Sequence, residues 1–215
     1  MKKIYIIGAG GFGREVAWLI ERINHNHKEW DIQGFLDDNN EKHGQPEGHY
    51  RVLGGCDILK ECKEEVWAVC AVGSAHVRKK IINRVMQYEN VKFATLIDPS
   101  VLYSDSVKIG EGTIVCAGCI LTVDISIGRH VLINLDCTVG HDAVLEDFVT
   151  VYPSVNISGC ATVEQEVELG TGAQIIQGKR IGYETIVGAG AVVVKDLPCK
   201  CTAVGAPAQP VKYKE

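Results

Sequence analysis

From Ile97 to Pro198 a six-residue pattern repeats seventeen times without an insertion. The first residue of each hexad is aliphatic in every repeat except the one that begins at Tyr103, and the fifth is small or β-branched in nearly all. A period of six fits neither one face of a helix nor the two-residue alternation of a long strand. Hexapeptide periodicity is typical of a parallel β-helix, in which short strands and turns stack as a solenoid. The hexads therefore predict an all-β solenoid over about half of the 215 residues.

The residues before the hexads alternate between strand and helix patterns. Apolar runs that end at glycine or acidic turn residues predict strands at Lys3–Ile7, Asp31–Leu36 and Val66–Val72. Apolar residues at helical spacing predict helices over Glu15–Ile23 and from Val77 to Val85. Strands that alternate with helices form a parallel sheet. We therefore expect an α/β, Rossmann-like domain at residues 1–92, followed by the β-helix domain at residues 93–215.

Composition limits the function and the location. All three tryptophans precede residue 93, as expected if the interior of the solenoid is narrow and filled by aliphatic side chains. A net charge of −5 argues against nucleic acid as a partner, because such proteins carry a basic stripe. No apolar run is long enough to span a membrane, and the run Ile4–Ile7 is too short for a signal peptide. We therefore expect a cytoplasmic protein.

The nine cysteines are expected to be free thiols, because their number is odd and the chain is not short. Cys116 and Cys119 form a CxxC motif, and Cys199 and Cys201 a CxC motif, and such spacings are compatible with zinc or redox chemistry. However, Cys119 and Cys137 both occupy the fifth position of a hexad, where other repeats have alanine or valine. We therefore expect the cysteines to fill the core, and no metal is expected.

A glycine-rich turn follows the first expected strand. Gly8, Gly10 and Gly13 match G-x-G-x-x-G between a strand and a helix, where backbone N–H groups and the helix dipole can meet a phosphate. Asp37 and Asp38 end the second strand, where a carboxylate can accept a hydrogen bond from a ribose hydroxyl. Together these residues predict nucleotide binding. They do not distinguish a dinucleotide from a nucleotide-sugar.

Two histidines, His130 and His141, lie in the hexads, and both are expected to face outward. His141 is followed by Asp142, which could orient or charge-stabilise the imidazole, and Asn134 lies one strand earlier. An imidazole is suited to remove a proton from an attacking hydroxyl or amine near neutral pH. No serine or cysteine has the surroundings of a nucleophile, so His141 is expected to act as a general base for direct transfer between two substrates.

The hexads, the C-terminal tail and the order of the domains resemble the left-handed β-helix acyltransferases. Within them, the chain resembles the sialic-acid O-acetyltransferase and UDP-amino-sugar N-acetyltransferase family of bacterial surface glycan synthesis. The resemblance covers nearly the whole chain. The segments that carry it are Ile6–Gly13, Phe35–Asp38, Val72–Gly73, Arg78–Ile81, Asn134, Gly140–Asp142 and Gly205–Ala208.

The resemblance implies a homotrimer, with acetyl-CoA in a groove between neighbouring β-helices and His141 as the base, made more basic by Asp142. The residues that it implies for the sugar nucleotide are Gly10, Gly11, Phe12, Asp37, Asp38 and Gly73. Those that it implies for acyl-CoA are Thr150, Gly159, Thr171 and Ala189, with Lys195, Lys200 and Lys212 as partners for the CoA phosphates.

The sequence departs from the family pattern at two positions. Amino-sugar N-acetyltransferases of the family often have a histidine in the glycine turn where Phe12 stands, and Phe12 cannot form a hydrogen bond. They also often have a histidine where Thr150 stands, beside the acyl-CoA. His141 and Asp142 are kept, so acyl transfer is expected. The identity of the sugar, the choice between a hydroxyl and an amine, and the acyl group stay open.

Three other functions are compatible with parts of the sequence. A nucleotide-binding trimeric scaffold or sensor would use the solenoid only for assembly and would not bind acyl-CoA. A γ-type carbonic anhydrase shares the solenoid, but it needs three zinc-binding histidines, and the hexads contain only His130 and His141. A dehydrogenase is excluded because no catalytic domain for hydride transfer follows the glycine turn.

Overall fold

The computed structural model describes residues 1–214, so Glu215, the last residue of the expected second domain, lies outside the described residues. The chain divides into two compact units, Met1–Pro99 and the residues from Ser100 onward. The first unit therefore extends beyond the expected boundary at residue 92. The reason is that β6 (Val91–Phe93) pairs in parallel with β5 (Val66–Cys70) and so completes the first sheet.

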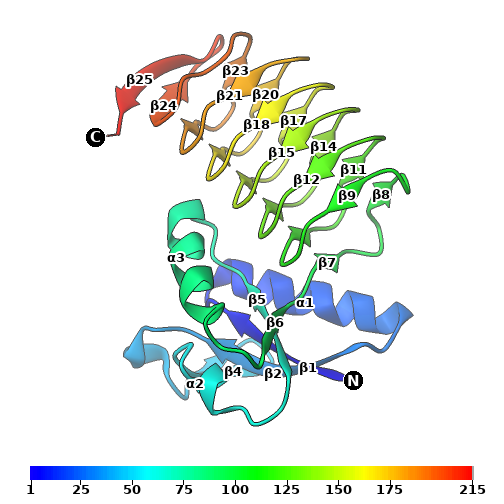
Figure 1. The fold of residues 1–215 in the computed structure, drawn as a ribbon, viewed down its shortest axis with the longest axis vertical. Coiled ribbons are helices and arrows are strands. Elements are labelled where there is room, and N and C mark those ends of the chain that lie inside the picture. Colours follow the sequence, from blue (N-terminus) through cyan, green and yellow to red (C-terminus); the bar gives the residue numbers. More distant parts are fainter. Residues whose placement is uncertain (215) are drawn as a thin grey trace. The chain divides into compact units, whose positions relative to one another are not determined.

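The first unit contains a six-stranded sheet in the order β3-β4-β2-β1-β5-β6 (Figure 1). The five strands β4, β2, β1, β5 and β6 run parallel, which confirms the expected parallel sheet, and only β3 pairs with its neighbour β4 in the antiparallel direction. The other strands of this sheet are β1 (Lys2–Ile7), β2 (Trp30–Leu36), β3 (Pro46–Glu47) and β4 (Tyr50–Gly54). A further strand of the unit, β7 (Leu96–Ile97), does not belong to this sheet. The hairpin of β3 and β4 was not expected, because its strands are too short to show a periodic pattern.

The helices of the first unit are α1 (Gly11–Asn26), η1 (Asn40–Lys42), α2 (Ile58–Glu61) and α3 (Ala75–Val85). The expected apolar stripe of α1 is buried at Val16, Leu19 and Ile20. This helix begins at Gly11, directly after the glycine turn, so its N-terminal N–H groups lie in that turn. No helix of the described residues is both long and apolar enough to cross a bilayer.

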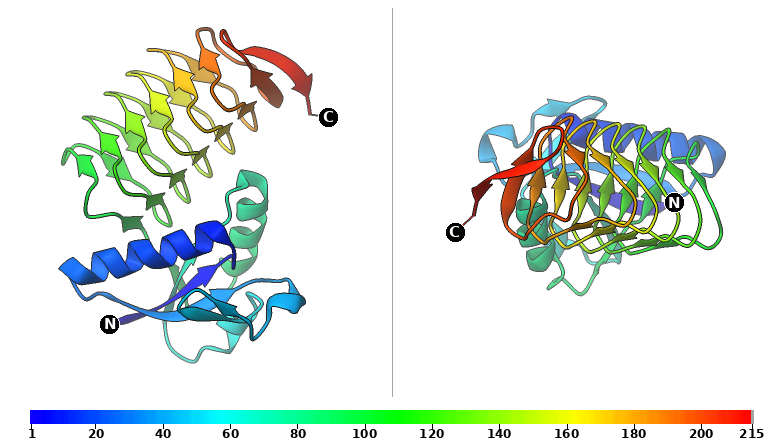
Figure 2. Two further views of the ribbon diagram at one scale, coloured as in Figure 1. Left: turned by 180° about the vertical axis from the view of Figure 1, so that it is seen from behind. Right: turned by 90° about the horizontal axis from the view of Figure 1, so that it is seen from above.

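The second unit is a β-helix made of two-residue strands. Each strand consists of the sixth residue of one hexad and the first of the next, and it pairs in parallel with the strand eighteen residues further on, as Ile114 does with Leu132. Three hexads therefore make one coil, and the coils stack along the unit (Figures 1 and 2). This arrangement confirms the solenoid that the hexads predict.

The β-helix has three sheets. The first sheet contains β10 (Ile114–Val115), β13 (Leu132–Ile133), β16 (Thr150–Val151), β19 (Glu168–Leu169), β22 (Ile186–Val187), β24 (Cys201–Val204) and β25 (Gln209–Tyr213). The second contains β8 (Leu102–Tyr103), β11 (Ile120–Leu121), β14 (Thr138–Val139), β17 (Asn156–Ile157), β20 (Gln174–Ile175) and β23 (Val192–Val193). The third contains β9 (Lys108–Ile109), β12 (Ser126–Ile127), β15 (Val144–Leu145), β18 (Thr162–Val163) and β21 (Arg180–Ile181). We name the turns between sheets corner 1–2, corner 2–3 and corner 3–1.

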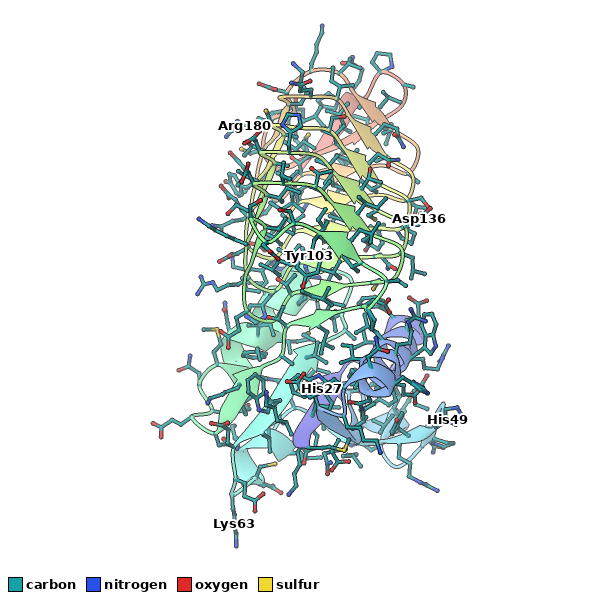
Figure 3. All side chains as sticks on the ribbon, turned by 90° about the vertical axis from the view of Figure 1, so that its right-hand side faces the viewer. His27, His49, Lys63, Tyr103, Asp136 and Arg180 are labelled. Carbon is teal, nitrogen blue, oxygen red and sulfur yellow. The ribbon has the colours of Figure 1, made fainter. Side chains whose placement is uncertain are left out.

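The corners share one backbone conformation. From Gly112 to Gly190, the fourth residue of every hexad has a φ between 54° and 79°, in the left-handed region that most L-residues avoid. The non-glycine residues at these positions are Asp124, His130, Asp136, Asp142, Phe148, Ser154, Cys160, Glu166 and Glu184. Because the turns of successive coils are alike, residues eighteen apart form a column along each corner. In Figure 3, Asp136 and Arg180 project from different sides of the β-helix.

The core confirms the expected role of Cys119 and Cys137, whereas the expectation that the cysteines fill the core is wrong for Cys160, which is exposed at a corner. Cys119 and Cys137 have no exposed surface, and all nine cysteines are free thiols. The Cys119 thiol donates to the Asn134 carbonyl at 3.0 Å. A hydrogen bond with Cys119, together with burial, raises the pKa of Cys137 well above its usual range. These two thiols are therefore core side chains without a reactive thiolate.

Candidate functional site

His141 and Asp142 lie at corner 2–3, directly after β14. The Nδ1 atom of His141 is 2.8 Å from Oδ2 of Asp142, and the two side chains are 52% and 60% exposed. The left-handed conformation of Asp142 places it in the tight turn beside the imidazole. When Nδ1 carries the proton and donates to the carboxylate, Nε2 is left as an acceptor. The expected outward position and pairing of His141 are confirmed.

Gly159 lies eighteen residues after His141, one coil further along the same column. A Cβ atom at Gly159 would be only 2.5 Å from Nε2 of His141, so only glycine leaves room for the ring. The coils are tied together here by Cys160, whose N–H donates to the His141 carbonyl at 2.7 Å. Within residues 1–214, the Gly159 N–H has no hydrogen-bond acceptor. The site thus places an imidazole beside a backbone donor that has no acceptor among the described residues.

Asn134 does not join this pair. It lies at corner 1–2, after β13, and its Oδ1 accepts the N–H of Leu135 at 2.8 Å. No hydrogen bond joins Asn134 to His141 in the described part of the chain. Asn134 and His141 are separated because they lie at different corners, and the Asn134 side chain bonds to its own backbone.

The residues expected to contact acyl-CoA fall on two corners. Gly159 and Lys195 belong to the His141 column at corner 2–3, whereas Thr171 and Ala189 form part of a column at corner 1–2. Thr171 is tied to the next coil there, because its carbonyl accepts the N–H of Gly190 at 2.8 Å. Thr150, in β16 of the first sheet, is only 2% exposed, so it offers a ligand little surface. One chain therefore does not gather these residues into one groove.

The three lysines expected to contact the CoA phosphates also lie at different positions on the β-helix. Lys195 is exposed at corner 2–3. Lys200 lies at the opposite side of its coil, with its Nζ 5.7 Å from the centre of the Tyr183 ring at corner 3–1. Lys212 is exposed on β25, at the end of the first sheet. Lys195 is therefore the lysine of the three that shares a corner with the base.

The expectation that His130 faces outward is wrong. His130 is 4% exposed and stacks on Phe148, with ring centres 5.3 Å apart and planes at 18°. Phe148 lies eighteen residues further on in the same column at corner 3–1, so it covers the imidazole. Gly112, one coil earlier, leaves room for it, because a Cβ atom there would be 2.1 Å from Nδ1 of His130. His130 is therefore a packing residue.

The glycines of the turn in the first unit serve two purposes. A Cβ atom at Gly13 would be 2.2 Å from the Gly8 carbonyl oxygen, and Gly8 itself has a φ of 106°, so packing and conformation require both. Gly10 has open space where its Cβ would be, and Gly11 has only the Arg14 guanidinium nearby, at 3.9 Å. The first turn of α1 contains no acidic residue. This helix end is open to an anion, with Arg14 beside it.

Asp37 ties the glycine turn to the end of β2. Its Oδ2 accepts the Ala9 N–H at 3.1 Å and Nζ of Lys42 at 2.8 Å, and Lys42 also donates to the Ala9 carbonyl at 2.7 Å. Burial would raise the pKa of Asp37, but hydrogen bonds from Lys42, Asn39 and Ala9 lower it below 3.8. Lys42 was not singled out from the sequence, because η1, which carries it, is only three residues long.

The ion-paired Asp37 makes the stability of the first unit depend on pH. A carboxyl with a lowered folded-state pKa adds stability above its unfolded pKa of about 3.8, and this is lost as pH falls through the folded value. We expect Asp37→Asn to lower the free energy of unfolding by about 1–3 kcal/mol at pH 7 and by much less at pH 3. Urea unfolding at the two pH values measures this. Asp105→Asn, at an exposed carboxylate, is the control, and an equal loss at both pH values would contradict the assignment.

Asp38 and Gly73 complete the edge where the carboxyl ends of the parallel strands meet. Oδ1 of Asp38 accepts the Cys56 N–H at 3.1 Å, and its Oδ2 pairs with Arg84. The Gly73 carbonyl accepts from Nη1 of the buried Arg78 at 3.0 Å. Ligands bind at this edge in open α/β sheets. The expected nucleotide residues are thus gathered at one edge, and both carboxylates already hold protein donors.

A hollow of about 260 Å³ lies along α1, beside the hairpin of β3 and β4. Its walls include the rings of Trp18, Phe35 and Tyr50, with Arg14 and Glu47 at the rim. The exposed end of the hairpin carries His49, which Figure 3 labels. Flat apolar walls suit a sugar or base ring. The sequence did not predict this hollow, because the hairpin that closes it was not predicted.

Comparison with known proteins adds to this geometry. Residues 3–85 match the family model described as the PglD N-terminal domain. The chain is 29% identical over 214 residues to GDP-perosamine N-acetyltransferase of Escherichia coli O157:H7, covering 96% of this chain and 95% of that protein. It is 35% identical over 118 residues to UDP-N-acetylbacillosamine N-acetyltransferase of Bacillus subtilis (strain 168), covering 54% and 52%.

Solved structures agree along the whole chain. A histidine-to-asparagine variant of perosamine N-acetyltransferase from Caulobacter crescentus, in complex with CoA and GDP-perosamine, has a TM-score of 0.90 at 29% identity, covering 99% of this chain and 98% of that one. The acetyltransferase domain of PglB from Neisseria gonorrhoeae FA1090, in complex with acetyl coenzyme A, has a TM-score of 0.88 at 30% identity, covering 98% and 99%.

The fold and its similarity to these structures define an acyltransferase of the left-handed β-helix class, which the family resemblance of the sequence implied. Within that class, the chain belongs to the UDP-amino-sugar N-acetyltransferase family.

Proposed function

We propose that this chain is an acetyl-CoA-dependent N-acetyltransferase that acts on the amine of a nucleotide-linked sugar for glycan synthesis. The observation that carries the proposal is the His141–Asp142 pair lying against Gly159. It provides an exposed general base next to a backbone donor. The similar proteins named above act on GDP-linked and UDP-linked amino sugars, which supports a nucleotide-sugar as substrate and an amine as the acceptor. A cytoplasmic location is part of this proposal.

In the proposed mechanism, the sugar amine attacks the carbonyl carbon of the acetyl thioester, and Nε2 of His141 takes the amine proton. The carbonyl oxygen becomes an oxyanion, which the Gly159 N–H stabilises. When the carbon–sulfur bond breaks, the CoA thiolate takes the proton from the imidazolium. Asp142 holds the tautomer that leaves Nε2 free and favours the charged ring. The products are the acetamido sugar and CoA.

The two corners that share the expected acyl-CoA residues support a trimer. Thr171 and Ala189 at corner 1–2 would meet the His141 column only if a neighbouring subunit brings its corner 1–2 against corner 2–3. The outer face of the second sheet carries exposed apolar side chains that such a contact would cover, Leu102 at 65% and Ile120 at 43% exposure. Light scattering of the purified protein tests this assembly.

The glycine turn would hold the diphosphate of the substrate. Gly10 and Gly11 let the ligand approach the N-terminus of α1, and Arg14, which is paired with Glu47, lies beside it. Phe12 is half-buried beside them and offers only an apolar surface to the sugar. The hollow along α1 is large enough for one ring of the substrate. Substrate selection would thus rest on shape and the phosphates more than on a side-chain hydrogen bond from position 12.

Two alanine substitutions in this turn should behave oppositely. Gly10→Ala should fold normally, because the φ of −153° suits any residue, but it should raise the KM for the nucleotide-sugar about tenfold by blocking its approach. Gly13→Ala should cost about 3 kcal/mol or more of stability, because its Cβ would overlap the Gly8 carbonyl. Steady-state kinetics and thermal unfolding measure the two effects. An unchanged KM in Gly10→Ala would remove the turn from the substrate site.

Replacing the carboxylate beside the base should slow the reaction without unfolding the protein. Asp142→Asn keeps the shape, but its amide can donate to Nδ1 and so favours the wrong tautomer of His141. We expect kcat to fall roughly tenfold or more, with acetyl-CoA binding unchanged. The control is Asp136→Asn, which alters the same hexad position at corner 1–2. Equal kcat values for the two variants would show that Asp142 only stabilises the corner turn and does not orient His141.

The proposal is tested by incubating the purified protein with acetyl-CoA and a panel of GDP-linked and UDP-linked amino and hydroxy sugars. Thiol release reports transfer, and mass spectrometry of the product distinguishes an amide from an ester. We expect turnover with a nucleotide-linked amino sugar. If acetyl-CoA does not bind in equilibrium dialysis, the chain is instead a nucleotide-binding scaffold.

A further inference from the structure

At corner 2–3, the thiol of Cys160 lies close to His141. Cys160 lies eighteen residues after Asp142 in the same column, and both have a φ of 58°. A nitrogen of His141, an oxygen of Asp142 and the sulfur of Cys160 all lie within 4.8 Å of one another, and all three side chains are exposed. Imidazole, carboxylate and thiolate are the ligand types of three-residue zinc sites that keep a fourth position open.

The backbone holds these three residues in place. The N–H of Cys160 donates to the His141 carbonyl at 2.7 Å, so the two coils cannot slide apart at this point. Gly178 follows in the same column one coil further on, and no atom lies within 4 Å of where its Cβ would be. The cluster is therefore open to the solvent on that side, and an ion could reach it.

The distances between the three ligand atoms are close to those between the ligand atoms around a bound metal ion. Tetrahedral coordination at the usual Zn–N, Zn–O and Zn–S lengths separates ligand atoms by roughly 3.3–3.7 Å. Exposed side chains can close the remaining distance by rotating about their own bonds. The thiol selects against Mg²⁺ and Ca²⁺, which prefer oxygen ligands, and favours Zn²⁺ or Co²⁺.

We propose that His141, Asp142 and Cys160 form a site for Zn²⁺ that switches the acetyltransferase off. On binding, the Cys160 thiol releases its proton to the solvent, and the ion occupies one nitrogen of His141. If that nitrogen is Nε2, the base is blocked directly. If it is Nδ1, the neutral ring carries its proton on Nε2 and cannot accept another. The ion is thus an inhibitor and not a resident cofactor, and only this inhibition rests on the proposed function.

Cobalt binding tests the site independently of the reaction. The purified full-length protein, without CoA, is titrated with Co²⁺ and then with Zn²⁺. We expect a sulfur-to-cobalt charge-transfer band that saturates at one ion per chain and disappears when Zn²⁺ is added. The band should persist in Cys199→Ala, a control at another partly exposed thiol, and be lost in Cys160→Ala. Its absence from the native protein, or its persistence in Cys160→Ala, would overturn the proposal.

Inhibition is then measured with acetyl-CoA and the accepted sugar. Zn²⁺ should inhibit the native protein reversibly, with activity restored by EDTA. In Cys160→Ala, the concentration needed for half inhibition should rise at least about tenfold, since even a group that only supports a ligand contributes about 10- to 100-fold to metal affinity. Equal inhibition of both proteins would place the inhibitory ion elsewhere and overturn the switch. If no sugar is accepted, the proposed function fails while the cobalt titration still decides the metal site.

Discussion

His141→Ala is expected to lower kcat by about 10²- to 10⁴-fold, the usual contribution of a general base. The imidazole is half exposed and is paired with Asp142, so its loss removes proton transfer and little packing. Affinity for CoA should stay within about twofold, because the implied cofactor contacts lie on other residues. Turnover is followed by thiol release, and CoA affinity by calorimetry.

The control for this variant is His27→Ala, at the exposed C-terminal cap of α1 in the first unit. It should keep the native kcat. A histidine variant of the Caulobacter enzyme binds both CoA and GDP-perosamine, so loss of one imidazole is compatible with binding in that relative. Unchanged turnover in His141→Ala would remove this residue from the mechanism and leave the fold assignment intact.

Gly159→Ala should lower kcat almost as much as His141→Ala is expected to. The added Cβ would lie 2.5 Å from Nε2 of His141, so the ring must swing away from both Asp142 and the Gly159 N–H. Misplacement of a reacting group by about 1 Å can cost on the order of 100-fold, and we expect a fall in kcat of that size. Kinetics and thermal unfolding of the same sample separate activity from stability.

The neighbouring substitution Ser158→Ala is the matched control, since Ser158 is exposed and adjacent in sequence. It should leave kcat and the melting temperature nearly unchanged. Because the imidazole is exposed and can move, Gly159→Ala should also shift the melting temperature only slightly. A variant that melts much earlier would point to a packing role, and one with native kcat would show that the ring does not need this glycine.

Much of the fold could be predicted because the hexads repeat a local rule. Each coil buries the same hexad positions, so the pattern is visible in the sequence without knowledge of which residues are in contact. The left-handed turns were harder to see. Glycine occupies some of the fourth positions, but residues as different as Phe148, Cys160 and Glu184 occupy others, so no single residue type marks the turn. The left-handed conformation at this position is fixed by the stacking of whole coils. The conformational propensity of a single residue does not predict it.

The candidate site was only partly accessible from the sequence. His141 and Asp142 could be singled out because they are adjacent. His130 was misplaced because Phe148, which covers it, lies a full coil away. The same register sets Gly159 against the imidazole and Cys160 beside it. Such relations need the eighteen-residue coil, and a six-residue period alone does not give it.

The coil also fixes a unit of length. Parallel strands are about 4.8 Å apart, so every distance along a corner is a whole number of such steps. His141 and Lys195 are three coils apart, or roughly 14 Å. A chain that gains or loses one complete coil between them would keep every side chain on its corner and change only this span. The distance between the two ends of the site can therefore change only in steps of one coil. This distance must match the length of the acyl carrier between its thioester and its phosphates.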